Sequence, residues 1–311
     1  MRIVFIGTGE IGLPTLRALL QSPAYAVVGV VTQPDKPVGR AQKIQPSPIK
    51  AALAGTGIPV LQPGKLRAPE SVAEVTALRA DVIVVMAYGQ ILSRAVLDLP
   101  SLACLNLHAS LLPLYRGAAP IQAAIAAGDA ETGITVMFMD AGLDTGDILL
   151  QARLPISPNE TGGSLHDCLA EIAPAALLEA LPLLESGHAP RRPQDAALAS
   201  YAPKLERAHG RIDWQQEAVM IERKIRAFDP WPGAFTEITD SHGQSRQLKI
   251  FRATVIPDTT GSPGTVTRPN DDVVVATGRG GLRLDLVQLE GKRRMASSEF
   301  FRGFSSPTLR F

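Results

Sequence analysis

The sequence predicts an α/β protein with a doubly wound, mostly parallel sheet, followed by a small OB-like β-barrel domain. Short apolar runs alternate with helical patterns over residues 1–188, which is typical of parallel strands covered by helices on both faces. Residues 189–206 lose this periodicity and gain proline, which predicts a linker. Residues 207–311 hold five short strand-like runs separated by turn signals. The length of 311 residues is enough for two such domains.

The elements of the first domain follow from its hydrophobic periodicity. Strands are expected at 3–6, 26–31, 81–86, 103–107 and 133–139. Helices are expected from about residue 13, at 48–55, at 120–127 and at 164–184. Because open α/β sheets bind ligands beyond the carboxyl ends of their strands, the residues just after each strand are the candidate site.

In the second domain one helix precedes the strands. Ala218, Ile221, Ile225 and Phe228 recur at helical spacing, and Asp213 is expected to cap this helix. The strands are expected at 235–238, 247–256, 264–268, 272–277 and 281–289. Five such strands suit a small barrel.

Composition excludes several classes of protein. The formal net charge of +1 gives no general attraction to nucleic acid or to membrane, but it divides into −3 for residues 1–206 and +4 for residues 207–311. Cys104 and Cys168 lie in apolar periodic segments and are expected to be buried thiols in a reducing compartment. No apolar run is long enough for a signal peptide or a membrane span, so we expect a cytoplasmic protein.

A glycine-rich turn follows the first strand. Gly7, Gly9 and Gly12 formally match the dinucleotide-binding pattern, and Asp35 could serve as its ribose-binding acid. However, Pro14 crowds the start of the helix, and Asp35 lies in a loop framed by prolines. We therefore favour a tight strand-to-helix turn over a dinucleotide site.

Asn106 and His108 give the first specific indication of chemistry. They lie at the end of an apolar strand, and a period of two places them on the same face, where both can meet one ligand. Asparagine can donate to a developing oxyanion without titrating, and histidine can donate, accept or carry charge near neutral pH. The pair is thus a candidate catalytic site.

A glycine-rich acidic loop follows the strand expected at 133–139. Its carboxylates, Asp140, Asp144 and Asp147, do not follow the spacing of a calcium loop, so we expect no metal. A carboxylate brought back to His108 would orient the imidazole. Periodicity alone does not choose among the three acids.

A resemblance to a known family is carried by residues 106–122 (NLHASLLPLYRGAAPIQ), together with residues 132–135 and 140–147. They closely resemble the folate-dependent formyltransferases, and the match extends to residues 2–8, 229–235 and 289–295. The resemblance implies a Rossmann-like first domain (1–188) that binds 10-formyltetrahydrofolate and an OB-like second domain (207–311) that binds tRNA. It implies no permanently bound cofactor and no metal.

The resemblance also assigns residues to roles. The implied catalytic residues are Asn106, His108 and Asp144. The implied folate contacts are Ser110, Leu111, Leu112 and Pro113, together with a loop around the pteridine formed by Ala87, Tyr88, Gly89, Gln90, Ile91 and Leu92.

Relatives of this family act on different amines with the same three catalytic residues, so these residues do not identify the substrate. Residues 36–50 hold four basic residues and no acid, and they resemble an insertion that grips the acceptor end of tRNA. Lys36, Arg40 and Lys43 are therefore the expected tRNA contacts. Initiator methionyl-tRNA is the implied acceptor, and the protein is expected to be a monomer. The alternative acceptor is a nucleotide-linked amine, and the alternative to an enzyme is an RNA-binding adaptor without activity.

The expected mechanism is direct acyl transfer. The amine attacks the formyl carbon, Asn106 and protonated His108 donate to the oxygen that becomes negative, and Asp144 orients His108 and accepts the amine proton.

Overall fold

A computed structural model of the chain describes residues 1–38, 42–239, 244–269 and 272–302. The chain divides into two compact units. The first unit comprises Met1–Pro120, Glu131–Pro155 and His166–Pro203, and the second comprises Ile121–Ala130, Ile156–Leu165 and Lys204–Phe311. Two short segments that precede residue 166 thus belong to the second unit.

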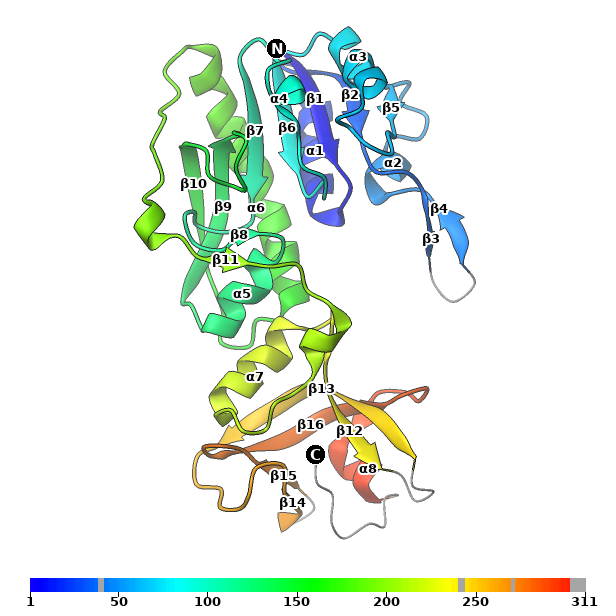
Figure 1. Ribbon diagram of the computed structural model, residues 1–311, viewed down its shortest axis with the longest axis vertical. Coiled ribbons are helices and arrows are strands. Elements are labelled where there is room, and N and C mark those ends of the chain that lie inside the picture. The colour runs from blue at the N-terminus through cyan, green and yellow to red at the C-terminus, as the bar shows by residue number, and fades with distance from the viewer. Residues whose placement is uncertain (39–41, 240–243, 270–271, 303–311) are drawn as a thin grey trace. The chain divides into compact units, whose positions relative to one another are not determined.

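A seven-stranded sheet forms the centre of the first unit, in the order β10-β9-β7-β6-β1-β2-β5 (Figure 1). Its strands are β1 (Arg2–Gly7), β2 (Ala26–Val31), β5 (Val60–Leu61), β6 (Val82–Met86), β7 (Ala103–His108), β9 (Glu131–Phe138) and β10 (Ile148–Pro155). The strands from β5 to β7 pair in parallel, whereas β9 and β10 are antiparallel to their neighbours. The prediction of a mostly parallel α/β sheet is confirmed.

The strand expected at 133–139 is present as β9, but it runs opposite to β7. His108, at the end of β7, pairs with Thr135, and Leu105 pairs with Phe138. The connection between the two strands therefore returns to the edge at which β7 ended, and β9 starts from that edge. Neither this reversal nor β10 was expected from the sequence.

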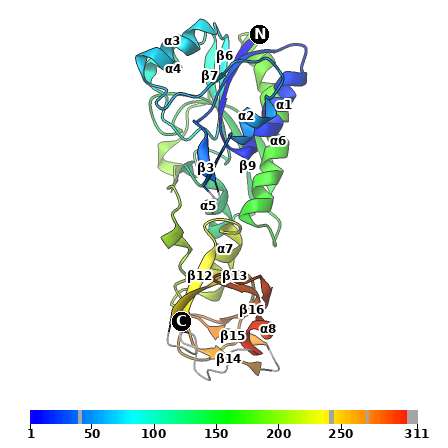
Figure 2. The ribbon, with the colours of Figure 1, turned by 90° about the vertical axis from the view of Figure 1, so that its right-hand side faces the viewer.

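Helices cover both faces of this sheet. α1 (Leu13–Gln21) and α6 (Gly162–Glu185) lie on one side, and α3 (Pro69–Ala77) and α4 (Arg94–Leu97) lie on the other (Figure 2). A short helix, α2 (Pro48–Ala52), lies close to α1. α3 and α4 were not expected from the sequence. Under them, β-strand side chains such as Ile6 and Ile83 form a core with Val75 and Val96 of these helices.

The second unit is built on an antiparallel sheet in the order β12-β13-β16-β15-β14, with β17 paired to β16. Its strands are β12 (Ala234–Thr239), β13 (Ser245–Ile256), β14 (Val266–Thr267), β15 (Val273–Ala276), β16 (Gly281–Leu289) and β17 (Met295–Ala296). α7 (Ala218–Ala227) packs on β13 and β16, and α8 (Ser297–Arg302) packs on β16. This curled sheet confirms the expected small barrel-like domain, with β17 and α8 as additions.

The core of the second unit explains the helical spacing seen in the sequence. Ile221 and Ile225 of α7 are fully buried among Leu248, Val275 and Val287 of the sheet. The expected cap was wrong, because α7 begins later than Asp213. The Asp213 carboxylate instead accepts from the backbone N–H of Gln215 at 3.0 Å and stabilises a turn before the helix.

The two cysteines differ in exposure. Cys104 on β7 is buried, and burial raises the pKa of its thiol to about 12. Cys168 is exposed on α6, so the expectation that both thiols are buried was wrong for this residue. An apolar periodic segment still has a solvent face, and Cys168 lies on it. No helix among the described residues is long and apolar enough to cross a membrane.

Candidate active site

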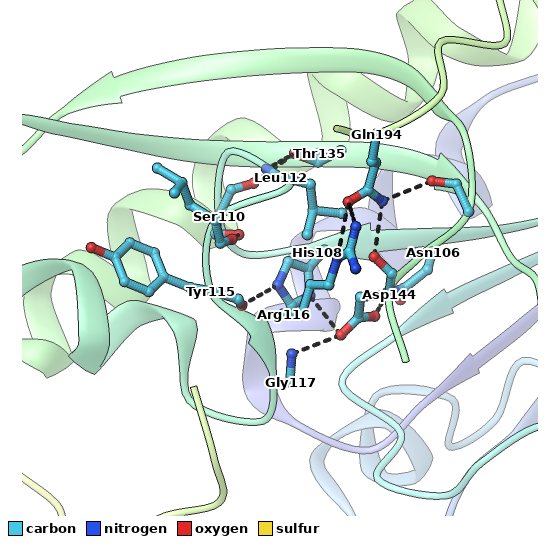
Figure 3. Close-up of polar contacts among 12 residues, drawn as sticks. Asn106, His108, Ser110, Leu112, Tyr115, Arg116, Gly117, Thr135, Asp144 and Gln194 are labelled. Atoms are coloured by element: carbon cyan, nitrogen blue, oxygen red, sulfur yellow. Dashed lines mark hydrogen bonds and ion pairs between the residues drawn. The ribbon is translucent and has the colours of Figure 1, made fainter. Parts of the chain in front are cut away.

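Asn106 and His108 lie on β7, as their spacing predicts. The strand is buried in the middle of the sheet, and alternate side chains leave its two faces in opposite directions. Asn106 is half-buried and His108 is buried, and both point toward Asp144 (Figure 3). The sheet therefore presents the two side chains together on a rigid strand.

The imidazole of His108 is held by the loop that follows β7. Its Nε2 lies 2.9 Å from the backbone oxygen of Tyr115. Because a carbonyl oxygen only accepts, Nε2 carries the proton and donates. The other ring nitrogen, Nδ1, faces the Asp144 carboxylate, with 3.6 Å between Nδ1 and Oδ2. Nδ1 is thus the ring atom directed toward the acidic side chain.

Asp144 belongs to the loop between β9 and β10. Its Oδ2 accepts from the backbone N–H of Gly117 at 2.9 Å, and its Oδ1 accepts from Nδ2 of Asn106 at 3.3 Å. A carboxylate that accepts a backbone N–H is held by a charge-assisted hydrogen bond. This loop thus brings Asp144 to Asn106, which lies 38 positions earlier in the chain.

Gly117 approaches its neighbours too closely for a side chain. It lies on β8 (Arg116–Gly117), which pairs in parallel with β11 (Tyr201–Ala202). Its φ is +112°, and a Cβ atom there would lie 2.7 Å from the backbone oxygen of Ala202. The N–H group that holds Asp144 is therefore at a position that requires glycine.

The other two acids of the loop have different partners. Asp140 accepts from the backbone N–H of Gly142 at 3.0 Å and from the hydroxyl of Thr145 at 2.7 Å, so it shapes the loop itself. Asp147 lies 3.7 Å from the guanidinium of Arg191. Of the three acids, the structure brings Asp144 to Asn106 and His108. Among the described residues, no group of three or more His, Cys, Asp or Glu side chains is placed to hold a metal ion.

The expected folate contacts after β7 form a tightly bonded loop. Ser110 is fully buried, and its hydroxyl donates to the backbone oxygen of Leu114 at 2.6 Å. Leu112 is buried. Its backbone N–H donates to the hydroxyl of Thr135 at 3.1 Å, and its backbone oxygen accepts from Nε2 of Gln151 at 2.9 Å. Leu111 and Pro113 are half-buried and present more of their surface. The hydroxyl of Ser110 thus shapes the loop from within.

The second set of expected folate contacts follows β6 and alternates in exposure. Ala87, Gly89 and Ile91 are exposed, with Ile91 at 84%. Tyr88 and Leu92 are buried, Gln90 is half-buried, and burial raises the pKa of the Tyr88 phenol to about 12. The exposed members are the ones that a ligand could contact.

The glycine-rich turn after β1 uses its own donors within the protein. The backbone N–H groups of Thr8 and Gly9 donate to the backbone oxygen of Ala87 at 3.2 and 3.3 Å. Asp35 accepts from Lys50 at 2.7 Å and from Gln62 at 2.6 Å, and the hydrogen bond from Lys50 is the main reason that its pKa lies below the usual value. Neither the turn nor the acid is arranged for a dinucleotide.

Of the expected tRNA contacts, two lie on a hairpin formed by β3 (Lys36–Val38) and β4 (Lys43–Gln45). Lys36 is exposed and donates to the side-chain oxygen of Gln33, and Lys43 is exposed. Arg40 lies outside the described residues. Lys50 is paired with Asp35, so its charge is partly neutralised.

Sequence reasoning missed Tyr115 and Gln194. Tyr115 supplies the carbonyl that holds His108, and Gln194 contacts the Asp144 loop from the segment predicted to be a linker. A backbone carbonyl leaves no trace in residue type, and a lone glutamine in an aperiodic segment carries no pattern. No signal in the sequence could have identified either contact.

Comparison with known proteins identifies relatives over nearly the whole chain. Residues 1–181 match the family described as "Formyl transferase", and residues 204–305 match "Formyl transferase, C-terminal domain". A methionyl-tRNA formyltransferase of Symbiobacterium thermophilum is 50% identical over 307 residues, covering 97% of this chain and 92% of that protein. A protein of the same name from Geobacter sulfurreducens is 46% identical over 305 residues, covering 98% and 94%.

Two solved structures are similar in fold. A sugar 3N-formyltransferase called WlaRD, solved with dTDP and 5-N-formyl-THF, has a TM-score of 0.66 and 18% identity, covering 94% of this chain and 99% of that chain. HypX from Aquifex aeolicus, in complex with tetrahydrofolic acid, has a TM-score of 0.64 and 20% identity, covering 99% of this chain and 48% of that chain. At these identities the likeness concerns the fold.

Proposed function

The chain belongs to the formyl transferase family, and from this premise we infer that it is a methionyl-tRNA formyltransferase. It transfers the formyl group of 10-formyltetrahydrofolate to the free α-amino group of initiator methionyl-tRNA. The proposal depends mainly on one observation: Asn106, His108 and Asp144 converge in a chain that is 50% identical, over 97% of its length, to a protein of that name. The alternative acceptor, a nucleotide-linked amine, is not favoured, because the sugar formyltransferase is only 18% identical.

We propose that these three residues carry out direct acyl transfer. The amine nitrogen attacks the formyl carbon, a C–N bond forms, and the carbonyl oxygen becomes negative. The amide N–H of Asn106 and the Nδ1–H of protonated His108 donate to this oxygen, while Tyr115 holds the imidazole through Nε2. Asp144 accepts the proton of the amine, directly or through water, and returns it to N10 of the folate as the bond between N10 and the formyl carbon breaks, the carbonyl re-forms and tetrahydrofolate leaves. The amine is itself the nucleophile, so no serine or cysteine is required.

We further propose how the substrates are bound. The folate contacts the loop of Ser110, Leu111, Leu112 and Pro113 through its half-buried members, Leu111 and Pro113. Residues 87–92 surround the pteridine, with the exposed Ala87, Gly89 and Ile91 nearest the ligand. The tRNA contacts Lys36, Arg40 and Lys43 and the +4 surface of residues 207–311. Residues 1–188 then form the catalytic domain, and residues 189–206 pair with it at Arg192 and at Tyr201–Ala202 before they lead to residues 207–311. The enzyme works in the cytoplasm as a monomer.

A formylation assay tests the proposal. The purified protein is incubated with 10-formyltetrahydrofolate and methionyl-tRNA, and the formylated aminoacyl group is measured after release from the tRNA. We expect formylmethionine with charged initiator tRNA, and none with the Asp144→Asn variant on the same time scale. Formylation of an amino-sugar nucleotide in preference to methionyl-tRNA would contradict the proposal. Folate-independent tRNA binding without turnover would instead support the adaptor alternative.

A further inference from the structure

Residues 191–202, which we call the strap, run along the candidate active site from one side to the other. At its start, the backbone of Arg192 exchanges hydrogen bonds with Ile148 at 2.8 and 3.0 Å, where β10 begins. At its end, Tyr201–Ala202 pairs with Arg116–Gly117 as β11 and β8. The strap is therefore fastened to the catalytic unit at both ends, although the sequence predicts it to be part of a linker.

Gln194 of the strap bonds the Asp144 loop through its Nε2 and bonds Arg116 through its Oε1 (Figure 3). Its Nε2 donates to the backbone oxygens of Asp144 and Gly146, each at 2.8 Å. Its Oε1 accepts from Nε and Nη2 of the buried Arg116, at 3.1 and 2.8 Å. A guanidinium only donates and a carbonyl only accepts, so these four contacts fix which end of the amide faces the loop.

The backbone that Gln194 holds has an unfavourable conformation. Asp144 has a φ of +54°, in the left-handed region that a residue with a side chain rarely adopts. Such a conformation persists only where the surrounding structure imposes it. The carboxylate of Asp144 accepts from Gly117 and Asn106, while its backbone oxygen accepts from Gln194. Gln194 therefore bonds the backbone of Asp144, the residue whose side chain belongs to the candidate catalytic site.

The same pattern recurs at His108. Tyr115, whose carbonyl holds the imidazole, has a φ of +58°. Its backbone N–H donates to the hydroxyl of Ser200, a second strap residue, at 2.9 Å. Asp144 and Tyr115, two non-glycine residues of the site with positive φ, are thus both bonded to side chains of the strap.

We propose that Gln194 is a positioning residue for formyl transfer: with its amide oriented by Arg116, it holds the backbone of Asp144 so that the carboxylate faces His108. The proposal rests on the proposed function. Gln194 acts on the substrate only through Asp144. Its loss should therefore lower the rate of the chemical step and leave the binding of both substrates unchanged.

Two variants separate the contacts of Gln194. Gln194→Met removes all four hydrogen bonds at nearly the same length, and Gln194→Glu keeps an acceptor for Arg116 while it removes both N–H donors. The measured quantity is the single-turnover formylation rate at saturating folate and methionyl-tRNA. We expect both variants to be about 10–100-fold slower, with unchanged Kd values for the two substrates. If Gln194→Met does not fold, Gln194→Glu decides the question.

Asp195→Ala is the matched control. The Asp195 carboxylate accepts from the backbone N–H of Ala197 at 2.9 Å, so its bond stays within the strap. We expect its rate to equal that of the unmodified enzyme. An equal loss in Asp195→Ala and Gln194→Met would mean that any disturbance of the strap lowers the rate, and it would overturn the specific role of Gln194.

A double-mutant cycle gives a readout that a merely structural role would not change. In the Asp144→Asn background, Gln194→Met should slow the reaction by less than about threefold further, because the group that it positions has already been replaced. Full additivity, or a normal rate in Gln194→Glu, would overturn the proposal. An unmodified enzyme that does not formylate methionyl-tRNA would instead overturn the proposed function, so the two failures are distinguishable.

Discussion

Replacing Asn106 by alanine removes the amide that we propose to donate to the developing oxyanion. The Nδ2 group carries two N–H bonds, and one of them reaches Oδ1 of Asp144 at 3.3 Å. This distance is beyond the usual range for an N–H···O bond, so the contact adds little to the placement of Asp144. The backbone N–H of Gly117, at 2.9 Å from the other oxygen of the same carboxylate, remains in the variant.

The loss in Asn106→Ala should therefore equal that of one preorganised oxyanion donor. Such donors contribute about 10²–10³ in kcat, or about 2.7–4 kcal/mol of transition-state stabilisation. The neutral carbonyl of the bound substrate needs the donor less, so KM for folate and for tRNA should change little. We expect Asn106→Ala to bind both substrates normally and to turn over about 10²–10³-fold more slowly than the unmodified enzyme.

Initial rates at saturating folate and methionyl-tRNA measure this effect. Asn159→Ala, at an exposed position, is a control of the same residue type and should keep the full rate. A thermal unfolding curve for each variant checks that the fold is retained. Near-normal turnover by a folded Asn106→Ala enzyme would refute the assignment of Asn106 as an oxyanion donor.

Three further predictions concern the tRNA contacts and the thiols. Because the +4 domain and the basic loop bind phosphates, the affinity for methionyl-tRNA should fall steeply with salt, with a log–log slope of about −0.7 to −0.9 for each phosphate contact; a salt-independent Kd would contradict this. Arg40→Ala should slow tRNA formylation without changing the folate Kd, whereas Arg17→Ala, an exposed arginine on α1, should change neither; equal loss of both functions would mean that the loop is structural. Burial disfavours the thiolate of Cys104 and raises its pKa to about 12, so at pH 8 only about one molecule in 10⁴ carries it. A disulfide reagent should then modify exposed Cys168 in the folded enzyme and Cys104 only after unfolding, and equal rates for the two thiols would contradict this.

Five strands of the first unit, β1, β2, β6, β7 and β9, were predictable because their signals are local. β2 and α5 (Pro120–Ala127) have the bounds expected from the sequence, since continuous apolar runs and helical spacing depend on neighbouring residues. By contrast, α3 and the β3–β4 hairpin lack a strong apolar pattern and were missed. The direction of β9 was also missed, because it depends on where the preceding connection ends.

The sequence by itself determined that Asn106 and His108 share one face at a strand end, because a strand alternates with a period of two whatever surrounds it. Periodicity did not distinguish among Asp140, Asp144 and Asp147 as the partner of His108, and only the resemblance to the formyltransferases indicated Asp144. Tertiary structure decided that Asp144 lies against Asn106, and that Gln194 bonds its backbone from 50 residues further along the chain. These contacts depend on the paths of loops, which are set by packing and by backbone hydrogen bonds between distant segments. Local sequence patterns carry no information about such paths.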